Sequence, residues 1–246
     1  TAIVWGLAFT AQRAGMDFVG PFTYNGVRFA LGALSLVPLL FVFRPARPAL
    51  GTSVPAGGAR KRLVFLRDGF IAGVLLFGGS SFQQVGIVYT TAGKAGFITG
   101  LYVVIVPIVG AMLGRRTDRG RWLGALLAVA GLYFLSITSS FTVSRGDFLV
   151  FLCAFFFAGH VRVLARLSRR WHPLRLAAVQ YVTCSLLSVL VAAVAEAPEL
   201  GSILDAWLPI VYGGVFSVGV AYSLQVIAQR DAHPAHAAIL LSLEGA

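Results

Sequence analysis

The chain has 246 residues, of which 58% are hydrophobic and only 12% are charged, and its mean hydropathy is +0.84. A soluble domain carries about 25% charged residues, so the composition excludes a water-soluble globular domain. The net charge of +11 does not indicate nucleic acid as a partner, because the basic residues cluster at the ends of apolar runs. We therefore predict an all-α polytopic membrane protein.

Seven apolar stretches are long enough to cross a bilayer, which takes about 17–25 residues per helix. They lie at residues 22–43, 69–89, 95–113, 122–138, 148–165, 174–195 and 207–228. Shorter apolar segments at 1–11 and 235–246 precede and follow them. Each short segment covers about half a crossing at a rise of about 1.5 Å per residue. We therefore predict a fragment that is truncated in its first and ninth helices.

The loops between these crossings differ sharply in charge. Sixteen of the 20 basic residues fall on alternate loops or at the helix ends beside them. Because short cytoplasmic loops retain positive charge, we predict that these loops and the N-terminus are cytoplasmic, in a multi-pass protein of a bacterial inner membrane. The basic residues of these loops are Arg44, Arg47, Arg60, Lys61, Arg62, Arg67, Arg115, Arg116, Arg119, Arg121, Arg162, Arg166, Arg169, Arg170, Arg175 and Arg230.

The sequence also contains a weak internal repeat. One segment matches another 152 residues later, and a second segment matches at a shift of 141 residues. Five crossings separate equivalent helices, so the second half must be inserted upside down relative to the first. Inverted repeats of this kind are typical of secondary transporters. The aligned pairs are Pro21 with Pro173, Arg28 with Gln180, Phe29 with Tyr181, and Gln84 with Gln225.

Several blocks resemble the EamA family of the drug/metabolite transporter superfamily. They are FQQVGIVYTTAGKAGFITGLYVVIVPIVGAMLGRR, RWLGALLAVAGLYFLS, LSRRWHPLRLAAVQ and ILLSLE. The resemblance implies a ten-helix fold of two inverted five-helix repeats, here at 1–139 and 147–246, around a central cavity. It also implies export or exchange of small metabolites, often amino acids or related compounds. The chain departs from the family pattern with Phe157 opposite Trp5, and with Gly245 where proline is usual.

Glycines within the crossings suggest close helix packing. Gly69 and Gly73 have the GxxxG spacing that lets helix backbones approach in lipid. The pairs 78–79 and 213–214 fall in corresponding helices of the two repeats. Such pairs either loosen a helix near a binding site or serve close packing.

Arg28 is the most informative polar residue inside a crossing. An arginine in mid-membrane costs about 2.5–3.5 kcal/mol on insertion scales. Tyr24, Asn25 and Arg28 share one helix face through their spacing, which predicts an inward-facing polar patch on the substrate pathway. The alternative is that Arg28 extends its side chain to the outer headgroups.

Other polar residues in the crossings complete the candidate pathway. Gln83, Gln84, Gln180 and Gln225 are amides that either contact substrate or form hydrogen bonds between helices. His160 is a candidate proton carrier because the unperturbed pKa of histidine lies near neutrality, with a structural hydrogen bond as the alternative. Glu244, the only acid inside a predicted span, is a second candidate for ion coupling.

Motifs for catalysis are absent from the sequence. There is no Walker loop, HExxH or GxSxG motif and no pair of carboxylates in one crossing, so we predict no enzyme activity, cofactor or metal. A secondary transporter of small metabolites is the favoured function. A lipid-carrier flippase of similar build and an intramembrane enzyme using His160 and Glu244 are the alternatives. The expected partners are a small-molecule substrate and the lipid bilayer, and a homodimer is left open.

Overall fold

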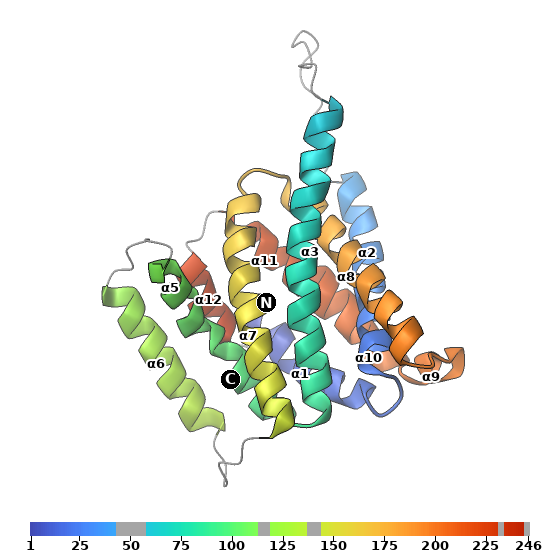
Figure 1. Cartoon of the computed structure of the whole chain (residues 1–246), viewed down its shortest axis with the longest axis horizontal. Helices are drawn as coiled ribbons and strands as arrows, with labels where there is room; N and C mark the ends of the chain where they lie inside the picture. The colour runs from blue at the N-terminus through green and yellow to red at the C-terminus, as the bar shows by residue number, and fades with distance from the viewer. Residues whose placement is uncertain (43–57, 113–118, 137–143, 231–233, 244–246) are drawn as a thin grey trace.

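The computed structural model describes residues 1–42, 58–112, 119–136, 144–230 and 234–243, and every regular element in these ranges is a helix. The long helices run side by side as a bundle (Figure 1). A membrane imposes this choice, because each helix pairs its own backbone N–H and C=O groups where no water is present. The predicted all-α membrane fold is confirmed.

Local sequence explains how some helices begin. Pro173 stands at the start of α8, where its missing N–H has no partner to lose. Ser144 and Asp147 form a reciprocal capping box at the start of α7. In chain order the helices are α1 (Ala2–Gly15), α2 (Pro21–Val42), α3 (Gly58–Val88), α4 (Ala92–Gly100), α5 (Tyr102–Met112), α6 (Arg119–Ser136), α7 (Arg145–Leu167), α8 (Pro173–Ala195), α9 (Leu200–Asp205), α10 (Trp207–Val211), the π-helix η1 (Tyr212–Tyr222), α11 (Ser223–Ala228) and α12 (Pro234–Ser242).

Within the described residues, six helical spans are long and apolar enough to cross a membrane. Six of the seven predicted crossings coincide with them. The seventh, at 122–138, falls on α6, whose first turn carries two arginines that lower its mean hydropathy. The six spans are Pro21–Phe41, Gly58–Val88, Ala92–Met112, Arg145–Leu167, Pro173–Ala195 and Trp207–Ala228.

The start of α3 differs most from the prediction. This helix begins at Gly58, whereas the predicted crossing starts at residue 69. Arg60, Lys61 and Arg62 in its first turns are exposed, and this end of α3 extends past the neighbouring helices (Figure 1). The prediction placed the start of the crossing where the apolar sequence begins. The helix itself continues through the charged residues before that point, because Arg and Lys have high helix propensity.

Polar side chains lie inside the bundle and apolar side chains cover its outside, as expected for a bundle surrounded by lipid. Leu34, Leu127 and Leu190 are each 64% exposed on the outside. Asn25 and Gln84 are fully buried inside. Lipid accepts exposed leucine without cost, whereas polar groups need partners within the protein.

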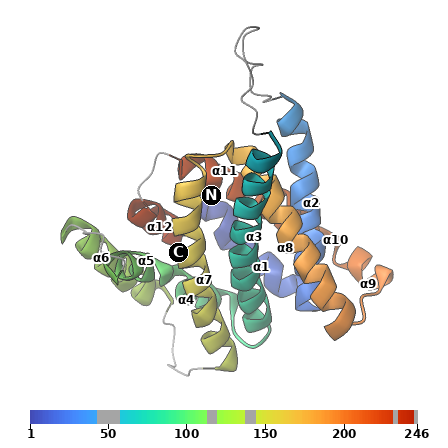
Figure 2. The ribbon, with the colours of Figure 1, turned by 45° about the horizontal axis from the view of Figure 1, so that its top comes forward.

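Helices from the two halves of the chain interleave. In Figure 2, α3 lies between α7 and α8, and the contacts of α3 are most extensive with these two helices. A Cβ atom added at Gly69 would lie 2.5 Å from Val179 Cγ1, and one at Gly73 would lie 2.5 Å from Thr183 Cβ. This glycine pair therefore permits the close packing of α3 on α8, as its spacing predicted.

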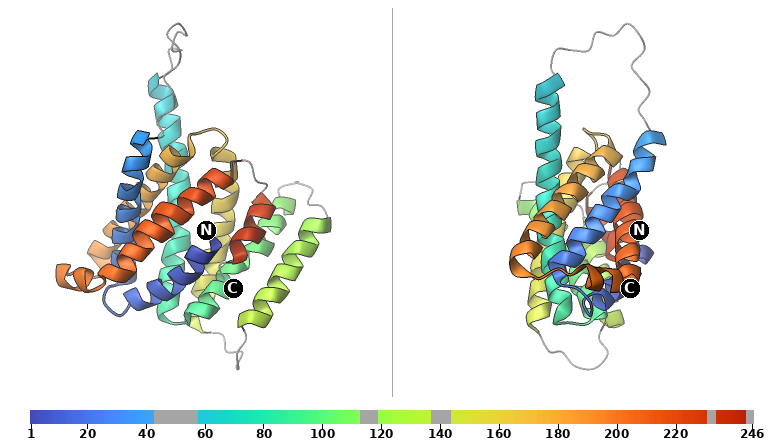
Figure 3. Two further views of the ribbon diagram at one scale, coloured as in Figure 1. Left: turned by 180° about the vertical axis from the view of Figure 1, so that it is seen from behind. Right: turned by 90° about the vertical axis from the view of Figure 1, so that its right-hand side faces the viewer.

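The span from α10 to α11 crosses one face of the bundle diagonally, with α1 beside it (Figure 3). Its middle is η1, an 11-residue π-helix that contains Gly213 and Gly214. A Cβ atom at Gly213 would lie 2.7 Å from Tyr24 Oη, and one at Gly214 would lie 2.8 Å from Leu31 Cβ. The glycines thus let η1 pack closely on α2. Gly78 and Gly79, in contrast, lie in α3, which stays α-helical.

Two carboxylates join the halves at opposite ends of the bundle. Glu196, after α8, accepts hydrogen bonds from the backbone N–H groups of Phe22 and Thr23, both at 2.8 Å, and so caps α2. At the other end, Asp68 on α3 accepts a hydrogen bond from Trp171 Nε1 at 2.9 Å, in the connection between α7 and α8. Each contact joins a helix of the first half to a segment of the second.

Candidate functional site

A cavity lies in the centre of the bundle, between α1, α2, α3, α5, α7, η1 and α11. The space left open between its lining side chains is about 30 Å³, room for on the order of one or two water molecules. A larger molecule would need the lining helices to move apart. The lining residues are Trp5, Ala8, Phe9, Gln12, Arg28, Gln83, Tyr102, Phe157, His160, Val161, Ser217, Tyr222 and Gln225.

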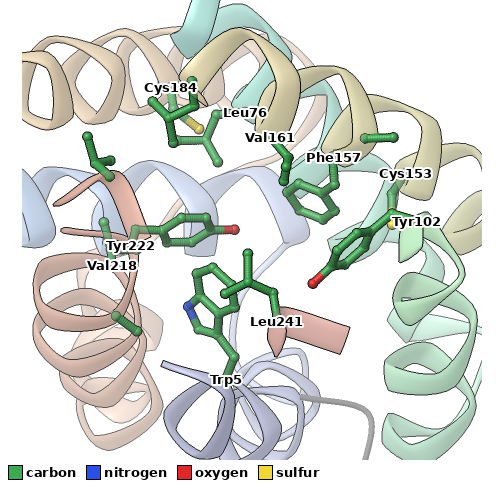
Figure 4. Packing of buried hydrophobic residues seen from close by; sticks show 14 of the residues in the cluster. Trp5, Leu76, Tyr102, Cys153, Phe157, Val161, Cys184, Val218, Tyr222 and Leu241 are labelled. Carbon is green, nitrogen blue, oxygen red and sulfur yellow. The ribbon is translucent and has the colours of Figure 1, made fainter. Parts of the chain in front are cut away.

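Aromatic side chains form a large part of the cavity wall. In the view of Figure 4, the rings of Trp5, Tyr102, Phe157 and Tyr222 are grouped around the side chain of Leu241, and all four rings line the cavity. The rings of Trp5 and Tyr222 lie 4.5 Å apart between centroids, and Trp5 Nε1 donates a hydrogen bond to Ser217 O on η1 at 3.2 Å. Such rings offer large apolar faces together with a few polar atoms, as is typical of small-molecule sites.

Positions that the internal sequence match aligns meet at this cavity. Trp5 and Phe157 stand 152 residues apart, the shift of the first internal match, and both line the wall. Two further pairs have the same shift of 152 residues, Ala8 with His160 and Phe9 with residue 161. All four of these residues line the cavity. A cavity built symmetrically from α1 and α7 is the geometry expected at the interface of inverted repeats.

Arg28 is 2% exposed and lines the cavity. Its Nε donates a hydrogen bond to Asn25 Oδ1 at 2.9 Å, and Asn25 Nδ2 in turn donates to Ser80 O at 3.1 Å. The guanidinium carbon lies 5.3 Å from the ring centroid of Tyr24 and 5.1 Å from that of Phe29. Arg28 therefore points into the bundle and is held by Asn25 and two rings, rather than extending toward lipid headgroups.

His160 lies on the same wall and is fully buried but for 1% of its surface. Its Nε2 donates a hydrogen bond to Gln180 Oε1 at 2.8 Å. Gln180 thus lies behind the wall and orients the imidazole that faces the cavity. Either role considered for His160, proton carriage or structural hydrogen bonding, is compatible with this position.

The three remaining candidate glutamines differ in whether their side chains face the cavity. Gln83 and Gln225 line the cavity, and Gln83 Nε2 donates to Thr99 Oγ1 at 3.1 Å. Gln84, one position further along α3, instead donates to Gln12 O on α1 at 3.3 Å. Adjacent helical residues point about 100° apart, so one glutamine faces the cavity while the other joins two helices.

Sequence reasoning missed several lining residues, and Glu244 lies outside the described residues. Gln12 carried a detectable signal, because it is a polar residue beside an apolar segment. Trp5 stood out only through its alignment with Phe157. Tyr102 and Tyr222 carried no signal, since aromatic residues make up 12% of the chain and are common in ordinary packing. Ser217 reaches the site because η1 carries it there.

Comparisons with known proteins agree with this architecture. An uncharacterized transporter of Archaeoglobus fulgidus is 34% identical over 246 residues, which is 99% of this chain and 72% of the relative. A protein of known crystal structure superposes with a TM-score of 0.70 over 99% of this chain and 84% of that one, and its 19% identity makes this a likeness of fold. The sequence profile of the EamA-like transporter family matches residues 1–137 and 144–246. The chain therefore belongs to the EamA-like transporter family.

Proposed function

We propose that this membrane transporter exports or exchanges a small metabolite, such as an amino acid or a related compound, through the central cavity. The observation that carries the proposal is the joint lining of the cavity by equivalent residues of α1 and α7. Substrate sites of secondary transporters lie near the membrane midplane at the interface of the repeats. Mixed aromatic and amide linings suit small polar molecules with an apolar part.

Movement of the lining helices is part of the proposal, because about 30 Å³ is too small for a metabolite. The element best suited to move is η1. An 11-residue π-helix lacks the regular α-helical hydrogen bonding of its neighbours, and three of its residues are glycines. Alternating access then consists of one repeat rocking against the other around the cavity.

The lipid-carrier flippase remains the alternative, and one feature favours it. An apolar groove of about 560 Å³ between α3 and α8 opens at the outer surface of the bundle. It is lined by Leu63, Leu66, Arg67, Phe70, Ala178, Val179, Val182 and Thr183. The groove does not, however, share any lining residue with the central cavity. A lipid bound in the groove would therefore not reach the polar groups of the cavity, which weighs against this alternative.

A cysteine in the cavity wall tests the pathway. We expect Ala8→Cys, in a complete gene product with Cys153 and Cys184 replaced by alanine, to lose transport after thiol modification, because the added group fills the cavity. Efflux of labelled amino acids from proteoliposomes measures the effect. Thr10→Cys, at an exposed position of the same helix, is the control and should keep its transport after modification. Unchanged transport by modified Ala8→Cys would contradict the proposed pathway.

The proposed orientation places the N-terminus and the exposed start of α3 in the cytoplasm of a bacterial cell. We expect a cysteine at Ala59 to be protected from an impermeant thiol reagent in intact cells, and a cysteine at Gly201 to be labelled. Both positions are exposed, so accessibility depends only on the side of the membrane. The native cysteines, Cys153 and Cys184, are buried. The opposite labelling pattern would reverse the topology.

A further inference from the structure

Arg28 is a buried cation without a countercharge among the described residues. Within the described residues, no carboxylate lies within 4.0 Å of the Arg28 guanidinium. Other arginines of the chain do form ion pairs with a carboxylate. Its hydrogen bond within the described residues uses Nε alone, and the acceptor is the neutral Asn25 amide. The two terminal nitrogens thus have no hydrogen-bond acceptor in the described residues.

This arrangement differs from an ordinary buried arginine. Guanidinium stays charged in proteins, so burial cannot neutralise it as it does other ionisable groups. The rings of Tyr24 and Phe29 compensate only part of the lost hydration. Buried charges are normally paired, and Arg28 faces a cavity in which a ligand can supply the missing partner.

Two acceptor atoms in the same cavity also lack partners in the described residues. They are the side-chain oxygens of Gln12 and Gln225, and both residues line the wall. An amide oxygen accepts a hydrogen bond from an N–H or O–H group. The cavity therefore offers donors at Arg28, acceptors at two glutamines, and aromatic faces such as that of Trp5.

We propose that the substrate of this site carries a carboxylate, which Arg28 binds through its two terminal nitrogens. Guanidinium matches a carboxylate with two parallel hydrogen bonds. Amino or hydroxyl groups of the substrate donate to Gln12 and Gln225, and its apolar part lies against the aromatic wall. Amines and quaternary ammonium compounds are rejected by the charge of Arg28, even though aromatic walls alone attract them. This inference rests on the proposed transport function.

Matched compounds test the charge selection. The probes are L-phenylalanine, L-leucine and L-alanine, each beside its amide, its deaminated carboxylic acid and its decarboxylated amine. We expect carboxylates to raise the thermal midpoint of the purified complete gene product and to compete for efflux, with amides and amines at least ten-fold weaker. Equal stabilisation and competition by the amides or amines would overturn the proposal, as would no effect of any carboxylate.

Variants of Arg28 supply the second test. Arg28→Leu should lose at least ten-fold in affinity for carboxylates while it keeps membrane abundance and a ligand-free thermal midpoint at or above the wild-type value, because an unpaired buried charge is removed. Arg28→Lys should be intermediate, since it keeps the charge without the planar fork. Arg13→Leu, at an exposed position, is the control and should bind normally. Carboxylate binding by Arg28→Leu at the wild-type affinity would overturn the proposal.

Variants of the two glutamines test whether the site distinguishes zwitterions from simple anions. Gln12→Met and Gln225→Met should weaken binding of the amino acids but leave the deaminated acids unchanged, because only the former donate an N–H group. Equal effects on both compounds would overturn the role of the glutamines. If modified Ala8→Cys blocks efflux but charge selection is absent, the carboxylate proposal fails while the proposed transport function stands.

Discussion

Replacing Gly146 by alanine should lower the free energy of unfolding by about 1–3 kcal/mol, the usual cost of overpacking. A Cβ atom at this position would lie 2.5 Å from Gly86 O, 2.7 Å from Tyr89 C and 2.9 Å from Thr90 N. All three atoms belong to the backbone at the end of α3 or just after it, so no side chain can rotate away. The clash is relieved only if α7 moves away from α3, and the contact between these two helices is among the most extensive in the bundle. The thermal midpoint in detergent measures the loss.

Gly93→Ala is the matched control for this prediction. No atom lies within 4 Å of a Cβ built at Gly93, and alanine favours a helix over glycine by about 1 kcal/mol. The control should therefore be neutral or slightly stabilising, opposite in sign to Gly146→Ala. Gly86→Ala should be destabilised as well, since its Cβ would lie 2.9 Å from Gly146 O. Equal thermal midpoints for Gly146→Ala and Gly93→Ala would show that the two helices separate without cost.

The helices of this protein are largely predictable from sequence because a bilayer requires long apolar segments. Six of the predicted crossings coincide with helical spans in the described residues. The prediction fails where a helix leaves the apolar phase, as α3 does at Gly58. It also misses η1, because π-helical and α-helical stretches have similar composition. Gly213 and Gly214 marked the right segment without revealing its hydrogen bonding.

The candidate site is only partly visible in the sequence. Polar residues inside apolar segments identify Arg28, Gln83, His160 and Gln225, because burying a polar group is costly and therefore rare. Whether such a residue faces the cavity depends on the rotation of its helix, which a sequence leaves open. The aromatic wall depends on contacts between distant helices, such as Trp5 with residue 222. Those contacts follow from packing and have no local signature.

Replacing Asp68 by alanine should destabilise the folded protein by about 1.5–3 kcal/mol, the contribution of a hydrogen bond to a charged group. Asp68 is 4% exposed and accepts a hydrogen bond from Trp171 Nε1 at 2.9 Å. It also pairs with Arg67 at 3.0 Å and with Arg170 at 3.4 Å. Both arginine side chains are more than half exposed, so these ion pairs add little, and most of the loss comes from the indole N–H left without its acceptor.

The Asp68 contact also has a consequence for transport, because it joins α3 of the first half to the α7–α8 connection of the second. In the proposed transport cycle, opening this end of the bundle requires that the contact break. Asp68→Asn keeps an acceptor for Trp171 but loses the charge, so its thermal midpoint should fall between those of Asp68→Ala and the wild type. Asp205→Ala, at an exposed position, is the control and should match the wild type. If Asp68→Ala and Asp205→Ala had the same thermal midpoint, the hydrogen bond to Trp171 would contribute nothing to the closed end, and another contact would have to hold the two halves together there.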